Sequence, residues 1–500
     1  MIDNSVFPSP VYKETVLAPL FEGSKKHFKQ GHLAIDQAHC IMLVEQGILS
    51  SQEGSDILNA LDEILQEVNF DELEYTGEFE DYFFFIEHCL KQKLGADLAG
   101  RLHTGRSRND IDHTLFKLNL KQRLFTLDSD LTQLTTTLLD VCELNYETIV
   151  LAYTHGQPAQ PTTFAHYLAA FVEVMHRDRQ RLFDSLEIVD LSPMGAAAIT
   201  TSGFNLSRDR VAELLGFIKP LQNSYGCISS CDYITSVYSA LKLLFIHISR
   251  FVQDMAQWSS FETGHLYVPN SLVQISSIMP QKRNPVPIEH MRLICSKGVG
   301  LCDTIVNAMH NTPFTDMNDS ESETQQVGYQ AFDNSHRLLS LLSTFIGSVS
   351  INQDRVMDHL DKSCATITEL ADTLVRKEAL SFRQAHEVVA DIANYVVRHQ
   401  LSLQTVPVDV FYSLFEQHIG RPSQLTESEL RFYASAKNFI NVREGFGGPA
   451  PIAMKKAVSR YREELQHLSD QWASIRTFSV EAAKVRLQAV NDVTSKQQRG

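Results

Sequence analysis

Positive charge is scarce in this sequence. Lysine and arginine together number 44 against 60 aspartates and glutamates, so the formal net charge is −16 at pH 7. A protein that binds nucleic acid generally needs a basic face, and this charge balance argues against such a partner. Long apolar runs are also missing, which argues against a membrane-spanning helix. We therefore expect neither a nucleic acid nor a membrane as a partner.

Closely spaced cysteine pairs are absent as well. The eight cysteines are scattered, and none forms a Cys-x-x-Cys pair. Cys227 and Cys231 are four residues apart, but no histidine near them in the sequence completes a metal site. Residues Met1 to Val16 lack the basic start and apolar core of a secretory signal. Scattered reduced thiols without such a signal predict a cytoplasmic protein.

Glycine and proline are missing from four long stretches, which are residues 107–155, 162–192, 227–263 and 348–406. Both residue types interrupt helices, so their absence favours long helices. Between Ile234 and Met255, apolar residues recur at helical spacing, as in the seam of a bundle. No segment shows a credible strand alternation. The sequence predicts an all-α fold with an elongated central helix bundle.

Glycine and proline also divide the chain into three predicted helical domains. Residues 1–105 and 358–500 are expected to hold shorter helices, and residues 106–357 the long central ones. The polar tail, residues 495–500, is expected to fray. Long helices that are apolar on more than one face need partners outside one subunit. We expect a homo-oligomer whose central helices bundle together, because the alternative, a monomeric solenoid, needs a sequence repeat that is absent.

The first of three polar stretches covers residues 276–285 and reads Ser-Ser-Ile-Met-Pro-Gln-Lys-Arg-Asn-Pro. Its prolines indicate a loop between helices. Two hydroxyls, two cations and an amide suit an anionic ligand, and loops often carry function. A solvated basic turn is the alternative.

The second stretch, residues 103–110, reads His-Thr-Gly-Arg-Ser-Arg-Asn-Asp and leads into a long predicted helix. Arg106 and Arg108 supply local positive charge, and arginine can grip a carboxylate with two hydrogen bonds. Ser107 and Asn109 stand at the helix start, where free backbone N–H groups favour anions. A simple N-cap would account for Ser107 or Asn109, but it does not explain two arginines within three residues.

The third stretch contains Thr154 and His155, which precede two prolines and a new helix. A histidine in such a turn can relay protons near neutral pH. The alternative is a histidine that only makes structural hydrogen bonds. We expect such a structural role for His166, inside the following helix.

Together the three stretches resemble the fumarase/aspartase superfamily, whose members cleave C–N or C–O bonds next to a carboxylate and usually release fumarate. Residues 276–285 are similar to its signature loop, although Ile275 stands where the family usually has glycine. Residues 103–110 are similar to the motif of the argininosuccinate lyase branch. Further matches, in the expected order, cover most of the chain: Glu80-Asp81, Thr154 to Pro161, Ser192 to Gly195, and residues 364–393.

The resemblance implies a role for each candidate residue. Ser276 would be the base that removes the proton β to nitrogen, and Lys282 and Asn284 would hold the carboxylate beside that carbon. His155, paired with Glu289, would relay or orient protons. The implied substrate-binding residues are Ser107, Arg108, Asn109, Thr154, Ser277 and Met279. It also implies a homotetramer whose sites combine stretches from three subunits, a dicarboxylate substrate, and no metal or organic cofactor.

The resemblance weakens where the branch holds the amine. Its run Tyr-Asn-Lys-Asp-Leu-Gln-Glu-Asp-Lys corresponds to residues 314–322, which read Phe-Thr-Asp-Met-Asn-Asp-Ser-Glu-Ser. Its tyrosine, glutamine and last lysine are thus replaced by Phe314, Asp319 and Ser322. Asp316, Asp319 and Glu321 are expected to favour a cationic amine without a carboxylate.

The resulting hypothesis is a carbon–nitrogen lyase that reversibly cleaves an N-substituted L-aspartate into fumarate and an amine. Argininosuccinate is the leading candidate substrate. Another amine, as in ethylenediamine-disuccinate, and nitrosuccinate are alternatives. A catalytically silent, crystallin-like protein is an alternative of another class, against which the retained Ser276, Lys282 and Asn284 argue.

Overall fold

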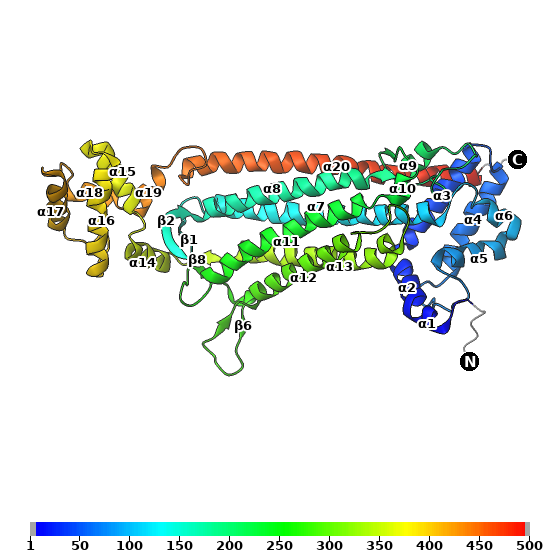
Figure 1. Cartoon of the computed structure of the whole chain (residues 1–500), viewed down its shortest axis with the longest axis horizontal. Helices are drawn as coiled ribbons and strands as arrows, with labels where there is room; N and C mark the ends of the chain where they lie inside the picture. The colour runs from blue at the N-terminus through cyan, green and yellow to red at the C-terminus, as the bar shows by residue number, and fades with distance from the viewer. Residues whose placement is uncertain (1–6, 496–500) are drawn as a thin grey trace.

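The computed structural model describes residues 7–495, and long helices dominate them. The helices run side by side in an elongated molecule (Figure 1). The all-α prediction is confirmed in its main feature. In the part of the chain that the structure describes, no helix is long and apolar enough to cross a membrane. Residues 496–500 of the tail, and the first six residues of the stretch considered as a secretory signal, lie outside the described residues.

Five helices form the central bundle. The apolar seam predicted on α11 is buried, since Val237, Leu241, Leu244 and Ile248 are fully covered. Phe171 and Phe251 stack between α8 and α11 with ring centroids 4.1 Å apart. The bundle helices are α7 (Arg108–Leu144), α8 (Phe164–Val189), α11 (Asp232–Trp258), α12 (Val286–Ala308) and α13 (Ser322–Ser348).

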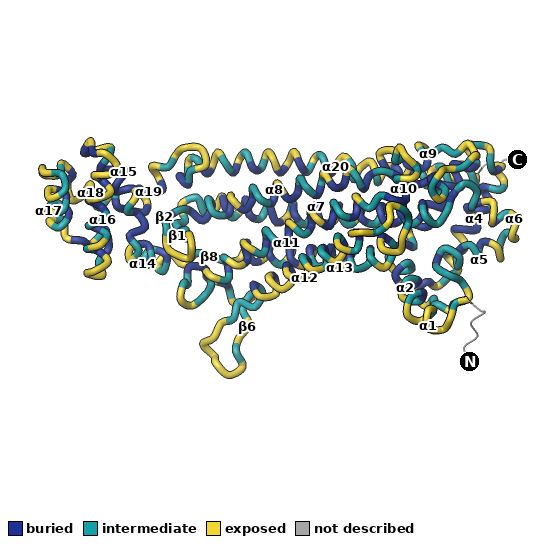
Figure 2. The backbone as a smooth tube through the Cα atoms, viewed as in Figure 1, coloured by how far each residue is buried: buried dark blue, intermediate teal, exposed yellow. Residues whose placement is uncertain are grey.

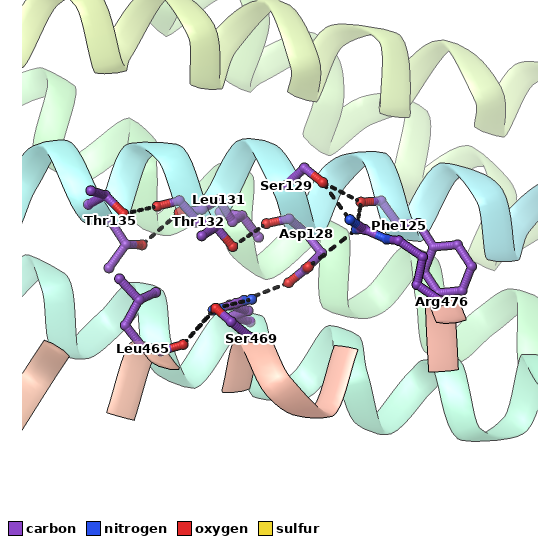
Figure 3. A network of polar contacts seen from close by, with 11 residues as sticks. Phe125, Asp128, Ser129, Leu131, Thr132, Thr135, Leu465, Ser469 and Arg476 are labelled. Atoms are coloured by element: carbon purple, nitrogen blue, oxygen red, sulfur yellow. Dashed lines mark hydrogen bonds and ion pairs between the residues drawn. The ribbon is translucent and has the colours of Figure 1, made fainter. Parts of the chain in front are cut away.

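Helix α20 (Pro451–Ser495) corrects the expectation that only shorter helices follow residue 358. It has 45 residues and packs along α7 and α8. A polar network ties these three helices together (Figure 3). In it, Arg179 of α8 donates to Asp128 of α7 at 2.6 Å, and Arg476 of α20 donates to the Phe125 carbonyl at 2.7 Å.

The N-terminal helices gather at the end of the bundle where α7 begins (Figure 1). Ser50 and Glu53 form a capping box that starts α4. Two short helices and a parallel strand pair also belong to this end. Its elements are α1 (Pro10–Tyr12), η1 (Lys13–Leu17), α2 (Ala18–His27), α3 (Lys29–Glu45), α4 (Ser51–Glu67), α5 (Tyr82–Leu94), α6 (Ala96–Arg101), β3 (Leu191–Ser192), α9 (Arg208–Leu215), β4 (Lys219–Pro220), α10 (Gly226–Ser229) and η3 (Asn318–Ser320).

A small helical unit occupies the opposite end and has an apolar core of its own. The limits of the three predicted domains, at residues 105 and 357, stay a prediction, although α20 returns from this unit to the bundle. The helices at this end are α14 (Gln353–Ser363), α15 (Ile367–Glu378), α16 (Phe382–Arg398), α17 (Val408–Ile419), α18 (Glu427–Tyr433) and α19 (Ala436–Asn441).

Short antiparallel strand pairs correct the expectation that the chain has no strands. β1 (Ile149–Thr154) pairs with β2 (Gln157–Thr163), and their register shifts between Ala152 and Tyr153. β5 (Leu266–Tyr267) pairs with β8 (Ser350–Ile351). The short helix η2 (Asn270–Leu272) follows β5 in the chain. β6 (Gln274–Ile275) pairs with β7 (Arg283–Asn284). These strands are too short, or too rich in proline, to give a period-two pattern in the sequence.

Candidate active site

The predicted loop of residues 276–285 is the tip of the β6–β7 hairpin between α11 and α12. Arg283 fastens its base by donating to the Val268 carbonyl at 2.7 Å and to Asn270 Oδ1 at 2.9 Å. The tip projects from the body of the molecule and is largely exposed (Figures 1 and 2). Arg283 is thus a structural anchor, and the remaining polar side chains of the tip are free to meet a ligand.

Ser276 is partly buried at the base of the tip, and two backbone N–H groups face its hydroxyl. Its Oγ accepts the backbone N–H of Met279 at 3.1 Å and the backbone N–H of Ile278 at 3.4 Å. Two N–H dipoles aimed at one oxygen stabilise negative charge on it. Ser277, Met279 and Lys282 are exposed on the same tip. The hairpin tip therefore holds a hydroxyl that faces two backbone N–H groups, and an ammonium group close by in sequence.

The Thr154–His155 turn joins β1 to β2. His155 and the following Gly156 both have positive φ, of 53° and 74°, as a two-residue hairpin turn of the I′ type requires. Thr154 and His155 are exposed. The left-handed backbone is strained for a histidine, and it holds the side chain outward from the end of the bundle. His166, by contrast, bonds Thr162 Oγ1 at 2.8 Å and the Gly447 carbonyl at 3.0 Å, which fits its expected structural role.

Glu289 lies in the first turn of α12 and is exposed. It lines a groove of about 960 Å³ between α11 and α12, together with Ser249, Gln253 and Leu293. Within the part of one chain that the structure describes, Glu289 and His155 do not form a hydrogen bond. Their predicted pairing stays a prediction.

The turn at residues 107–110 starts α7 and is rigidly held. Asp110 is fully buried, and its carboxylate accepts the N–H of Ser107 at 2.8 Å, of Gly195 at 2.9 Å and of Ala197 at 3.0 Å. Burial raises the pKa of this carboxyl, and the three N–H groups oppose the rise. Asp110 thereby fixes the start of α7 to the 194–197 loop.

The two arginines of this turn differ, which corrects the expectation that both supply positive charge to a ligand. Arg106 is buried and forms an ion pair with Asp36 at 2.6 Å, so it serves the fold. Arg108 is partly exposed and contacts Glu80 at 3.0 Å and Asp81 at 2.6 Å. Only Arg108 therefore remains available to a carboxylate ligand at this end of α7.

Asn109 is oriented from both sides. Its Oδ1 accepts the hydroxyl of Ser107 at 2.8 Å, and its Nδ2 donates to Asp316 Oδ2. Asn109 lines a cavity of about 290 Å³ together with Arg108, Asp112 and Glu321. The second hydrogen of its amide is left to donate to a ligand.

Three carboxyl groups crowd together beside Asn109. Burial and the neighbouring Asp81 raise the pKa of Asp112 to about 8, although Arg108 opposes them. Burial and the Asp112 carboxylate raise the pKa of Glu321 well above its usual range. The adjacent His113 side chain holds the pKa of Asp316 below its usual value. Close carboxylates cannot all ionise unless a cation joins them.

His113 extends this cluster inward. Its Nδ1 lies 3.1 Å from the hydroxyl of Tyr233, and its Nε2 faces Asp316 Oδ1 at 3.6 Å. One ligand atom each from His113, Asp316 and Glu321 lies within 4.8 Å of the others, a spacing that a metal ion could also fill. The sequence analysis missed Asp112 and His113. The available signal was that Asp112 and His113 lie one turn after Asn109, on the same side of the predicted helix.

The candidate residues fall into two groups at opposite ends of the bundle. Ser107, Arg108 and Asn109 lie at the start of α7, whereas Thr154 and His155 follow its far end. The 37 residues of α7 span about 55 Å at ~1.5 Å per residue. The Ser276 hairpin also lies away from the start of α7 (Figure 1). One chain therefore does not bring all the candidate residues into one cavity.

Comparisons with known proteins cover nearly the whole chain. A family model described as "Lyase" matches residues 22–300, and one described as "Argininosuccinate lyase C-terminal" matches residues 364–440. The chain is 54% identical to argininosuccinate lyase 2 of Agrobacterium fabrum, over 93% of this chain and 92% of that protein. It is 30% identical to argininosuccinate lyase 1 of Shouchella clausii, over 93% and 94%. Its fold is similar to that of EDDS lyase in complex with formate, with a TM-score of 0.86, 23% identity, and coverage of 98% and 97%.

Proposed function

This chain belongs to the argininosuccinate lyase branch of the fumarase/aspartase superfamily, and from that premise we propose how its residues act. The protein is a carbon–nitrogen lyase that cleaves an N-substituted L-aspartate into fumarate and an amine. Argininosuccinate, which would give arginine, is the leading candidate substrate.

The proposed reaction is a β-elimination. Ser276, as an alkoxide, takes the proton from the carbon β to nitrogen. The electron pair of that C–H bond forms the double bond of fumarate, and the C–N bond breaks with its pair on nitrogen. The nitrogen takes up a proton and leaves as the amine, so atoms and charge balance. Every step is reversible, and the reverse reaction adds an amine to fumarate.

The observation that carries this proposal is the environment of Ser276. A serine is a poor base at its ordinary pKa and needs its alkoxide stabilised. The N–H groups of Ile278 and Met279 point at its Oγ, and the Lys282 ammonium lies on the same tip. Such donors also occur in ordinary serine turns, and what distinguishes this turn is that it carries an ammonium and an amide as well.

The remaining roles follow the chemistry of the intermediate. Lys282 and Asn284 hold the carboxylate beside the deprotonated carbon, because that carboxylate takes on negative charge as the proton leaves. His155 with Glu289 relays or orients protons. The other contacts to the fumarate half come from Ser107, Arg108, Asn109, Thr154, Ser277 and Met279.

A homotetramer with shared sites completes the proposal. The two groups of candidate residues are about a bundle length apart, so one copy must lend its Ser276 hairpin or its His155 turn to the α7 start of another. Leu243 and Leu293, on α11 and α12, are 36% and 50% exposed. Apolar side chains beside a groove of about 960 Å³ support a second copy packed on this face. All eight cysteines are free, which supports a cytoplasmic location.

Fumarate release from purified protein tests this function. We would follow fumarate absorbance with argininosuccinate, ethylenediamine-disuccinate and nitrosuccinate as substrates. We expect argininosuccinate to give the highest kcat/KM. Release from another compound alone would replace the substrate and keep the reaction. If no compound releases fumarate and the protein consumes no fumarate in the reverse reaction with the corresponding amines, the crystallin-like alternative is favoured.

A further inference from the structure

The cavity beside the start of α7 carries far more negative than positive charge. Arg108 is the only lysine or arginine among its described lining residues, and it already contacts Glu80 and Asp81. Beyond these two, Asp112, Asp316 and Glu321 also line the cavity. Within the described chain, Arg108 is shared among these groups, and the His113 imidazole faces Asp316 at 3.6 Å. Such a cluster either keeps protons or binds a cation.

A second observation is that the cluster includes buried polar atoms without a hydrogen-bond partner among the described residues. His113 is 1% exposed, and its Nε2 has no hydrogen-bond partner among the described residues. Asp316 Oδ1, at 3.6 Å from this nitrogen, is also buried without one. Buried polar atoms are nearly always paired in folded proteins. Two unpaired atoms that face each other next to a cavity indicate a polar group that arrives from outside the chain.

Residues 314–322, which supply Asp316 and Glu321 to this cavity wall, also differ from the branch toward more negative charge. The argininosuccinate lyase branch has lysine at the position of Asp316 and again at the position of Ser322. Residues 314–322 contain no lysine or arginine at all. A segment that loses two cations and keeps the same number of carboxylates is more negative, so it no longer suits a carboxylate of the substrate and suits an ammonium instead.

The position of the cluster relates it to the reaction. Asp112 lies three residues after Asn109 on α7, which is about one turn or ~5 Å along the helix. Asp316 accepts a hydrogen bond from Asn109 itself. If Asn109 holds the fumarate half, as the proposed function has it, the bound substrate lies in the same cavity as these three carboxylates. We propose, on the basis of that function, that Asp112, Asp316 and Glu321 bind a positively charged nitrogen on the amine tail, and that the tail needs no carboxylate.

Three matched substrates test the inference with the wild-type enzyme. The first is argininosuccinate, whose tail carries an ammonium and a carboxylate. The second is its analogue without the tail carboxylate, and the third lacks the ammonium as well. We expect the second compound to match argininosuccinate in kcat/KM within about threefold. We expect the neutral tail to lose about tenfold or more, as befits a lost charge-assisted hydrogen bond.

Two variants locate the effect. Glu321→Gln should lower the preference for the charged over the neutral tail about tenfold, because glutamine cannot give up a proton and become negative when the cationic tail binds. The structure corrects the expectation that Asp319 acts with Asp316 and Glu321, because Asp319 is exposed and lies outside the cavity lining. Asp319→Asn is therefore the matched control. It should leave the preference unchanged. The wild-type comparison stands even if Glu321→Gln does not fold.

The outcomes separate this inference from the proposed function. If argininosuccinate and the neutral-tail analogue are cleaved equally well, the inference falls and the lyase function stands. The inference also falls if loss of the tail carboxylate abolishes cleavage. It falls again if a chelator removes the preference for the charged tail and added Mn²⁺ restores it, because a metal ion then fills the cluster. If none of the three compounds releases fumarate, the proposed function and the inference fall together.

Discussion

The two ends of the central bundle present opposite kinds of polar surface. At the start of α7, the candidate residues are held by hydrogen bonds within the chain: Asn109 by Ser107 and Asp316, and Arg108 by Glu80 and Asp81. At the other end, Thr154, His155 and the Ser276 tip lie on exposed hairpins (Figure 2). At the first end, hydrogen bonds within the chain fix the side chains that line the cavity. At the second end, the candidate groups lie on exposed hairpins.

This difference indicates that the two ends have different tasks in the proposed function. A wall that is rigid within one chain suits the recognition of a substrate, because its geometry costs little to organise at binding. Groups on hairpins can approach a wall of another copy and close over a substrate. The chemistry of elimination and the recognition of the amine therefore belong, in our proposal, to different ends of different copies.

The largest expected effect comes from the hairpin end. Ser276→Ala removes the base, and we expect kcat to fall about 10³-fold or more. Because Ser276 is on an exposed tip, the free energy of unfolding should change by no more than about 0.5 kcal/mol. Steady-state kinetics and urea unfolding measure the two quantities. Gln281→Ala on the same tip is the control and should keep full activity. Activity of Ser276→Ala within tenfold of wild type would assign the base elsewhere.

Mixing two inactive variants tests whether one site takes Ser276 and Asn109 from different copies of the chain. Ser276→Ala lacks a working hairpin, and Asn109→Ala lacks a working wall. If each site takes these two residues from different copies, random reassembly of an equal mixture gives about one intact site in four. We expect about a quarter of wild-type activity after the mixture is unfolded and refolded together. If hairpin and wall of one site come from the same copy, the mixture stays as inactive as its parents.

A smaller effect is expected from the ammonium of the hairpin. Lys282→Met keeps an unbranched side chain and removes the charge, so kcat/KM should fall about 10²-fold. Arg283→Met provides the contrast, because Arg283 anchors the hairpin base to Val268 and Asn270. Limited proteolysis should cut the hairpin faster in Arg283→Met and at the wild-type rate in Lys282→Met. Near-normal turnover of Lys282→Met would remove the lysine from the mechanism.

The sequence was a good guide to the long helices and a poor one to where they stop. The run without glycine and proline continues to residue 155, yet α7 ends at Leu144. Asn145 ends the helix by donating its amide to the Val141 carbonyl at 2.7 Å and accepting from Thr148 at 2.9 Å. Asparagine can terminate a helix in this way without glycine, so the run hid the β1–β2 hairpin.

The sequence predicted which residue types make up the candidate site, but it did not predict which residues each of them contacts. The pattern Arg-Ser-Arg-Asn indicated an anion site, but it could not distinguish Arg106 from Arg108. That distinction depends on Asp36, which lies 70 residues away in sequence and neutralises only Arg106. The same holds for the acidic cluster, because Asp112 and Glu321 meet only when α7 and α13 pack together.

The smallest expected effect is a pH-dependent change in the free energy of unfolding that comes from Asp112, in the cavity at the start of α7. Asp112 has a pKa of about 8 in the folded chain, against about 3.9 for an unfolded aspartate. Between these values the folded state binds more protons than the unfolded state, so the contribution of this carboxyl to stability is lost as pH rises from about 4 to about 8. Asp112→Asn removes this loss, and its free energy of unfolding should exceed that of wild type at pH 9.

Because Asp112 is partly exposed, solvent reduces the effect to roughly 1–2 kcal/mol. Urea unfolding at pH 6 and pH 9, at one protein concentration, measures the difference between the variant and wild type. That difference should grow with pH for Asp112→Asn and stay constant for the exposed control Asp319→Asn. Equal curves for Asp112→Asn and wild type would show that Asp112 holds no proton in this pH range and carries its negative charge without a ligand. A fully charged wall would bind a cationic tail with the same affinity across this pH range, whereas a protonated one must release a proton first.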